Sequence, residues 1–150
     1  MKKMKRKLYI AYGSNMSVEQ MKFRCPNAVL AGTGMLKGWS LVFQYHATIE
    51  ENAGGTVPVV VWEITKADEN KLDRYEGFPS YYLKRDVRIT YTDQDGNRHE
   101  TQKAMVYVMH PSYRGGKKKP SRDYFEVLSE GYERFGFDKN ILQNAYDEAL

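Results

Sequence analysis

The sequence is poor in the residues that crosslink small domains or hold metal ions. Its single cysteine, Cys25, cannot form a disulfide within the chain, and such usage is typical of a reducing compartment. Cys25 has no CxxC partner, and the three histidines, His46, His99 and His110, share no spacing typical of metal ligands. The composition therefore argues against a disulfide-stapled miniprotein and against a structural zinc site.

Long apolar runs are also missing. The longest, residues 57–62, is interrupted by Pro58 and is far shorter than the roughly 20 residues that span a bilayer. After the basic N-terminal residues, only residues 8–10 are apolar, whereas a signal peptide needs an apolar stretch of about 7–15 residues. We therefore expect no membrane partner, no signal peptide and a cytoplasmic protein.

The positive charge is concentrated at one end of the chain. Residues 1–7 hold five of the 23 lysines and arginines and no acidic residue, and the remainder carries 18 basic and 19 acidic residues. A nucleic-acid-binding domain is expected to carry a basic face on its folded part, so no nucleic-acid partner is predicted. The pattern predicts a basic disordered tail over residues 1–7 and a single domain over residues 8–150, which is an ordinary domain length.

Periodicity and turn residues predict six strands and four helices in this domain. Residues 34–38 are expected to form a turn between two strands, and residues 46–55 a polar loop. The predicted strands cover residues 7–12, 28–36, 39–45, 56–64, 81–92 and 98–109, and the predicted helices begin after the capping residues Ser17, Thr65, Ser121 and Asp138.

The order of these elements predicts an α+β fold. A regular strand–helix alternation, as in a doubly wound sheet, is absent. Six short strands with few helices favour a mixed sheet or a small barrel with helices outside, in which the strand edges are closed or covered.

The segment Tyr12-Gly13-Ser14-Asn15 lies between a predicted strand and a predicted helix. Gly13 permits unusual backbone angles and close approach of a ligand, and successive free amides beside a helix start can cradle an anion or a carbonyl oxygen. The same residue types are common in ordinary turns, and that alternative stays open at this point.

Glu76 precedes Gly77 at the end of the second predicted helix. A carboxylate there faces the negative end of the helix dipole, and partial burial raises its pKa further towards neutrality. A general base working near pH 7 needs such a pKa. The alternative is a solvated glutamate beside a helix-ending glycine. Four neighbours are candidates for apolar walls: Tyr75, Phe78, Tyr81 and Tyr82.

Two further features lie in the C-terminal part. Tyr124, three residues after the capping Ser121, either presents its hydroxyl to a ligand or belongs to the apolar stripe of its helix. The basic loop over residues 110–119 is interpreted as a solvated surface loop rather than as a site for an acidic leaving group.

Three motifs occur in an order that resembles the γ-glutamylcyclotransferase-like family, which includes the plant AIG2-like proteins. Residues 9–16, YIAYGSNM, look like its N-terminal signature, and residues 72–77, LDRYEG, resemble its acidic motif. Residues 120–124, PSRDY, with the later Gly131-Tyr132 and residues 136–138, are similar to its C-terminal helix pair. The resemblance extends from about Leu8 to the end of the chain.

This resemblance implies a small mixed β-barrel with surrounding helices and a reaction on a small-molecule γ-glutamyl substrate. The α-amine of the glutamyl group attacks its own γ-carbonyl and releases 5-oxoproline and a free amine or amino acid, with no metal or organic cofactor. Glu76 is then implied as the general acid/base. The implied substrate-binding residues are Tyr9, Ile10, Ala11, Tyr12, Gly13, Ser14, Asn15, Tyr82 and Tyr124.

Two alternative functions remain at this stage: a non-catalytic binding module and an amidohydrolase. A non-catalytic module that binds a γ-glutamyl metabolite is expected to lack the acidic residue, whereas Glu76 is present. An amidohydrolase acting through Ser14 needs a histidine base that no spacing identifies. The sequence predicts neither the leaving amine nor the oligomeric state.

Overall fold

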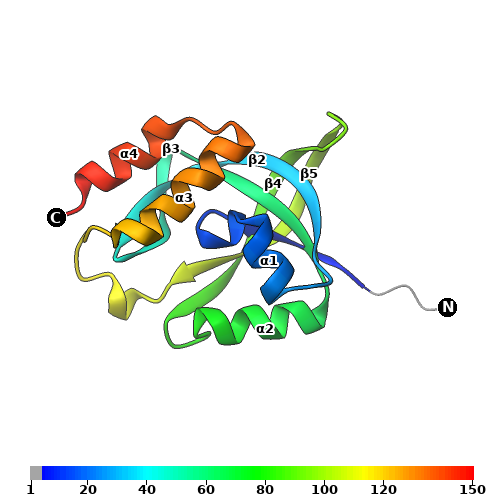
Figure 1. Cartoon of the computed structure of the whole chain (residues 1–150), viewed down its shortest axis with the longest axis horizontal. Helices are drawn as coiled ribbons and strands as arrows, with labels where there is room; N and C mark the ends of the chain where they lie inside the picture. Colours follow the sequence, from blue (N-terminus) through cyan, green and yellow to red (C-terminus); the bar gives the residue numbers. More distant parts are fainter. Residues whose placement is uncertain (1–4) are drawn as a thin grey trace.

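A closed five-stranded sheet forms the centre of the molecule in the computed structural model, which describes residues 5–150 (Figure 1). The strand order around the ring is β1-β3-β2-β4-β5. Neighbouring strands are antiparallel, except that β1 and β5 pair in parallel and close the ring. The expected α+β class and small mixed barrel are therefore confirmed. The strands are β1 (Lys7–Ala11), β2 (Val29–Gln44), β3 (His46–Ile64), β4 (Tyr82–Asp93) and β5 (Arg98–Met109).

The long strands β2 and β3 correct the prediction over residues 28–64. The expected turn at residues 34–38 is wrong, because β2 continues through it with a register shift between Lys37 and Trp39 beside Gly38, whose φ is 88°. At this shift Gly38 alone stands opposite residues 52–55 of β3, and pairing resumes on both sides, so the irregularity does not end the ladder. The expected loop at residues 46–55 is also wrong. Residues 46–51 pair with β2, for example Trp39 with Glu51, so their backbone groups are satisfied although several of their side chains are polar. Residues 52–55 continue β3 across the register shift to Thr56.

The helices begin and end where the capping residues predict. Thr65 and Asp68 form a reciprocal capping box at the start of α2, and Gly77 and Gly136 end α2 and α3 with φ values of 65° and 70°. Ser17 accepts a hydrogen bond from the Gln20 amide and caps α1. The helical elements are η1 (Ser14–Met16), α1 (Val18–Arg24), α2 (Lys66–Glu76), η2 (Pro111–Tyr113), α3 (Arg122–Phe135) and α4 (Lys139–Glu148).

The helices cover the barrel in two groups (Figure 1). α3 lies beside α4 on one side, and α1 and α2 lie on the other. The side chains of Leu128 and Tyr132 on α3 are fully buried, as its apolar stripe predicts, and Phe125 packs between Phe43 and Tyr146. Within residues 5–150, no helix has both the length and the apolar character needed to cross a membrane.

The basic segments at both ends of the domain are tied to the fold. Lys7 is the first residue of β1, and the Arg6 guanidinium donates to the backbone oxygen of Asn27 at 2.6 Å. The domain boundary predicted at residue 8 therefore moves to include both residues, and residues 1–4 lie outside the described part. In the 110–119 loop, Lys119 Nζ donates to the backbone oxygen of Ala149 at 2.7 Å.

One ionic network attaches α2 to the barrel. Glu69 is only 3% exposed, and its carboxylate lies 3.0 Å from Lys7 Nζ of β1 and 2.8 Å from Lys84 Nζ of β4. Lys84 Nζ also lies 2.9 Å from Asp73, which accepts a hydrogen bond of 2.6 Å from the Tyr107 hydroxyl of β5. Burial alone raises the pKa of Glu69, but hydrogen bonds from Lys84 and Lys7 bring it below its ordinary value. Three strands thus hold the helix that ends at Glu76.

Replacing Lys84 by methionine is expected to lower the free energy of unfolding by roughly 2–3 kcal/mol, because two carboxylates lose the cation they share. The measurement is urea unfolding followed by circular dichroism at pH 7. The control is Lys103→Met, whose ion pair with Asp86 at 3.6 Å is exposed and should cost less than about 1 kcal/mol. Equal losses in the two variants contradict the assignment.

Candidate active site

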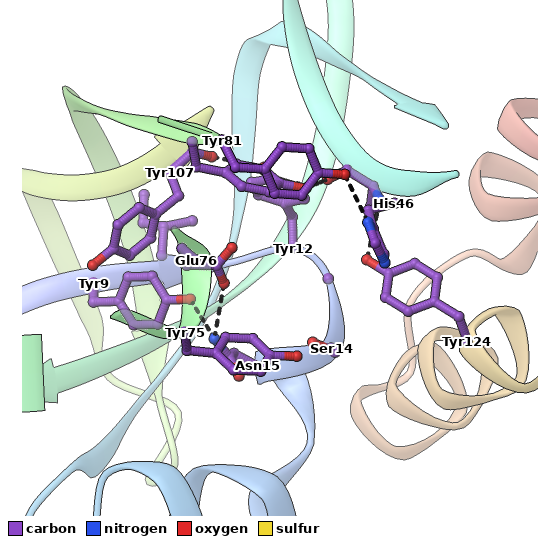
Figure 2. A pocket seen from close by; sticks show the side chains of 14 residues that line it. Tyr9, Tyr12, Ser14, Asn15, His46, Tyr75, Glu76, Tyr81, Tyr107 and Tyr124 are labelled. Atoms are coloured by element: carbon purple, nitrogen blue, oxygen red, sulfur yellow. Dashed lines mark hydrogen bonds between the residues drawn. The ribbon is translucent and has the colours of Figure 1, made fainter. Parts of the chain in front are cut away.

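A pocket of about 190 Å³ lies where β1 runs into η1 and where α2 ends (Figure 2). Residues from the far parts of the chain meet there: the start of β3, the start of β4, β5 and α3. Of the predicted site residues, Ala11 does not line the pocket. It pairs with Val60 in the β1–β3 ladder and is 2% exposed, so it leads the chain to the pocket without facing it. The others line it: Tyr9, Ile10, Tyr12, Gly13, Ser14, Asn15, Glu76, Tyr82 and Tyr124.

Glu76 projects into this pocket from the last residue of α2. Gly77 takes a left-handed conformation directly after it, which stops the helix and leaves the carboxylate at its end. Burial raises the pKa of Glu76 to about 7, and the Arg24 cation offsets part of this effect. The pKa shift has the direction that the sequence predicts. The carboxylate can therefore exchange a proton near neutral pH.

The turn from β1 into η1 leaves backbone donors free at the pocket. The amide of Met16 donates to the Gly13 oxygen at 3.0 Å, whereas the amides of Gly13, Ser14 and Asn15 have no partner among residues 5–150. A Cβ atom on Gly13 would lie 3.4 Å from the Tyr124 hydroxyl, so a side chain there would fill the space between them. The glycine therefore keeps open the room that a ligand needs.

Asn15 is held on several sides and is only 3% exposed. Its Nδ2 donates to the Tyr9 hydroxyl at 3.0 Å and to Glu76 Oε1 at 3.5 Å (Figure 2). Its backbone oxygen accepts from the Trp62 indole at 3.0 Å. The side chain of Asn15 is thus an amide donor aimed at the carboxylate.

Two tyrosine hydroxyls of the pocket are occupied as donors. Tyr82 donates to the backbone oxygen of Ala47 at 2.7 Å, and Tyr12 donates to the backbone oxygen of Tyr107 at 2.7 Å. The first hydrogen bond connects β4 with β3, and the second connects the residue after β1 with β5, both at the pocket end of the barrel.

Two other hydroxyls keep a hydrogen to offer. The Tyr124 hydroxyl accepts from the Ala47 amide at 3.0 Å, and the Tyr9 hydroxyl accepts from Asn15. Neither hydroxyl hydrogen has an acceptor within the described residues. Burial raises the pKa of both tyrosines above the ordinary value of 10, so both stay protonated. Tyr9 and Tyr124 are therefore two buried or half-buried tyrosines that can donate to a ligand.

Three pocket residues, His46, Ala47 and Tyr107, carry no signal that the sequence offered for the site. His46 Nδ1 lies 2.7 Å from the Tyr81 hydroxyl, and both line the wall opposite Asn15 (Figure 2). Tyr81 and Tyr75 were expected only as walls, and they do line the pocket, whereas Phe78 does not. His46 and Tyr107 reach the site through strand pairing, which no local spacing reveals.

Comparison with known proteins places this chain among its relatives. A family model described as "Gamma-glutamyl cyclotransferase, AIG2-like" matches residues 9–126. The γ-glutamylcyclotransferase of Mus musculus is 32% identical over 156 residues, covering 95% of this chain and 76% of the mouse protein. That of Bos taurus is 34% identical over 102 residues, covering 59% of this chain and 53% of the bovine protein. The aligned part thus spans about half of the bovine relative.

The same architecture occurs in solved structures. One described as "Gamma-glutamyl cyclotransferase" superposes with a TM-score of 0.72 at 24% identity, covering 94% of this chain and 86% of that chain. The helix-covered closed sheet of this chain is therefore a fold already known from solved structures. The chain belongs to the γ-glutamyl cyclotransferase, AIG2-like family, as the three motifs suggested, and the matched region contains every residue that lines the pocket.

Replacing Glu76 by glutamine is expected to stabilise the protein at pH 8 but not at pH 4.5. A carboxyl whose pKa is raised from about 4.5 to about 7 holds its proton more tightly when folded, so the wild type loses stability as the pH rises through that window. The gain at pH 8 should reach up to about 3 kcal/mol. Chemical unfolding at the two pH values measures it.

The exposed Glu133 provides a matched control for this change, because Glu133→Gln removes the same charge without removing a buried one. A gain for Glu76→Gln that is the same at both pH values contradicts the raised pKa.

Proposed function

We propose that this chain is a γ-glutamylcyclotransferase that cleaves a γ-glutamyl amide by intramolecular aminolysis. The bond between the α-nitrogen and the γ-carbonyl carbon forms, the bond from that carbon to the leaving nitrogen breaks, and 5-oxoproline and a free amine or amino acid result. The single observation that carries this proposal is the half-buried carboxylate of Glu76, with a pKa raised to about 7, in a pocket lined by residues with amide and hydroxyl donors.

Glu76 serves as the general base and then as the general acid. The α-amine of the substrate is an ammonium ion at neutral pH and cannot attack until it loses a proton. The carboxylate of Glu76 accepts that proton and afterwards delivers it to the leaving nitrogen, which departs as an amine. The α-nitrogen loses a second proton as the lactam forms, and this proton passes to solvent or converts the released amine to its ammonium form. A base with a pKa near 7 is suited to both transfers at physiological pH.

The donors around the pocket stabilise the negative charge that develops on the carbonyl oxygen. The residues with free amides, Gly13, Ser14 and Asn15, and those with an unpaired hydroxyl hydrogen, Tyr9 and Tyr124, line the same pocket. Donors fixed in place before the reaction need no reorganisation when the charge forms. They also supply contacts for the carboxylate and carbonyl groups of the glutamyl moiety.

The attacking amine is part of the substrate, so the pocket mainly has to hold the glutamyl chain in a ring-like conformation. A well-oriented intramolecular attack lowers the barrier by about 7–11 kcal/mol. The hydrogen bonds from Tyr12 to Tyr107 of β5 and from Tyr82 to Ala47 of β3 fix the pocket end of the barrel and support this positioning.

The route through Ser14 as a nucleophile finds less support. The Ser14 hydroxyl accepts from the Arg24 guanidinium at 3.4 Å, and no histidine of the described chain bonds to it. Without a base at hydrogen-bond distance the hydroxyl is a weak nucleophile.

The first experiment is incubation with a panel of γ-glutamyl amino acids and γ-glutamyl amines, followed by assay of 5-oxoproline and of free glutamate. We expect 5-oxoproline from at least one substrate and none from Glu76→Gln. The acidic limb of kcat/KM should report a pKa of about 7, with the activity rising as the pH increases through it, because the base must be ionised.

Each product pattern decides among the alternatives. Free glutamate in place of 5-oxoproline indicates hydrolysis, and tight binding with neither product indicates a binding module. Unchanged release of 5-oxoproline by Glu76→Gln, with circular dichroism matching the wild type, overturns the role of Glu76.

Tyr124→Phe and Tyr82→Phe form a matched pair for the donor role. Each removes one hydrogen bond to the backbone of Ala47, so similar losses of about 1 kcal/mol in stability are expected. Only Tyr124 has a hydroxyl hydrogen left for a ligand, so Tyr124→Phe should lower kcat/KM by roughly tenfold or more and Tyr82→Phe much less. Steady-state kinetics with the best substrate of the panel measures this difference, and equal losses contradict the assignment of Tyr124 as a donor.

A further inference from the structure

Arg24 contacts two residues of the site, Ser14 and Asn15, but does not itself line the pocket. It is the last residue of α1, and its guanidinium donates to Asn15 Oδ1 at 2.5 Å and to the Ser14 hydroxyl at 3.4 Å. The same group lies over the ring of Tyr75, 3.4 Å from its centre. Arg24 therefore connects α1 with the β1–η1 turn and with the end of α2.

The chemistry of the guanidinium dictates how the Asn15 amide is turned. Arginine carries donors only and stays charged, so the atom of Asn15 that faces it must be the oxygen. The NH₂ group then points the other way, towards Tyr9 and Glu76 Oε1. The opposite orientation would set the amide nitrogen against the guanidinium and the amide oxygen against the carboxylate, so both contacts would become repulsive.

We propose that Arg24 is a positioning residue of this site: it fixes the side-chain amide of Asn15 so that Nδ2 donates to the Glu76 carboxylate. The role in turnover rests on the proposed function, whereas the orientation of the amide does not. Through Asn15, a residue outside the pocket favours the ionised base. The long Nδ2 to Oε1 distance of 3.5 Å leaves the carboxylate free to take a proton from the substrate.

Arg24 supplies the positive charge that acts on the Glu76 carboxylate. The other titratable groups that line the pocket with Glu76 come from α2, from β1 and the residue after it, from β3, β4, β5 and α3, and from the turn before β4. None of them is a lysine, an arginine or a carboxylate: Tyr9, Tyr12, His46, Tyr75, Tyr81, Tyr82, Tyr107 and Tyr124. Arg24 can thus act on Glu76 in two ways, directly by its charge and through Asn15 by orientation. An experiment has to separate these two routes.

The separation uses NMR titration of the Glu76 carboxyl carbon in protein labelled with ¹³C-glutamate, with the signal assigned by its loss in Glu76→Gln. The titration is run for the wild type, Arg24→Met, Asn15→Ala and the double variant. We expect Arg24→Met to shift the pKa of Glu76 upwards, and to shift it by less when Asn15 is already absent. Lys22→Met removes an exposed charge from the same helix and should leave the pKa unchanged.

The outcomes are distinct. Equal upward shifts in both backgrounds mean that Arg24 acts by its charge alone, and no shift means that it does not act on Glu76; either result overturns the proposal. Circular dichroism checks the fold of each variant, and Arg24→Gln replaces Arg24→Met if the latter does not fold.

Steady-state kinetics of the same variants provide a second measurement, and its outcome does not affect the interpretation of the NMR titration. Arg24→Met should lower kcat by roughly tenfold and move the acidic limb of the pH profile upwards with the titrated pKa. Arg24→Lys, which can still donate to Asn15 Oδ1, should restore most of the rate. If no substrate yields 5-oxoproline from the wild type, the proposed function fails, while the titration still decides the orientation of Asn15.

Discussion

The carboxyl group of Glu76 is half-buried where α2 ends, and its desolvation raises its pKa and determines which neighbouring groups can stabilise its ionised form. A buried charge is costly unless it is paired, and the carbonyl groups at a helix C-terminus add negative potential. The cation of Arg24 opposes this effect, and the Asn15 amide, which Arg24 contacts, donates to the same carboxylate. The protonated and ionised forms thereby stay close in free energy near neutral pH, which acid/base exchange requires.

One face of α2 carries three carboxylates, of which two attach the helix to the barrel and the third lines the pocket. Glu69, Asp73 and Glu76 are spaced by four and three residues and so share a face of the helix. The first two are paired with lysines of β1 and β4, and these pairs attach the helix to the barrel. Within residues 5–150, no ion pair holds the third. The paired carboxylates hold in place the helix whose unpaired carboxylate faces the pocket.

Much of the fold follows from local signals. The capping residues, the glycines after α2 and α3, and the apolar stripe of α3 each predict an element because the forces involved act within one or two turns of chain. The prediction failed over residues 34–55, where local polarity and glycine content suggested a turn and a loop. Pairing between β2 and β3 overrides both, because a ladder satisfies the backbone whatever the side chains are.

The sequence by itself determined the family, the α+β class and the three segments that carry the site, since these reside in contiguous residues such as 9–16 and 72–77. Only the tertiary structure decided which groups meet. Ring closure brings His46 and Tyr107 to the pocket, and the end of α1 brings Arg24 behind Asn15. It also decided which tyrosines keep a free hydroxyl hydrogen. Hydrogen bonds and burial between distant segments depend on the three-dimensional path of the chain, which no spacing along the sequence encodes.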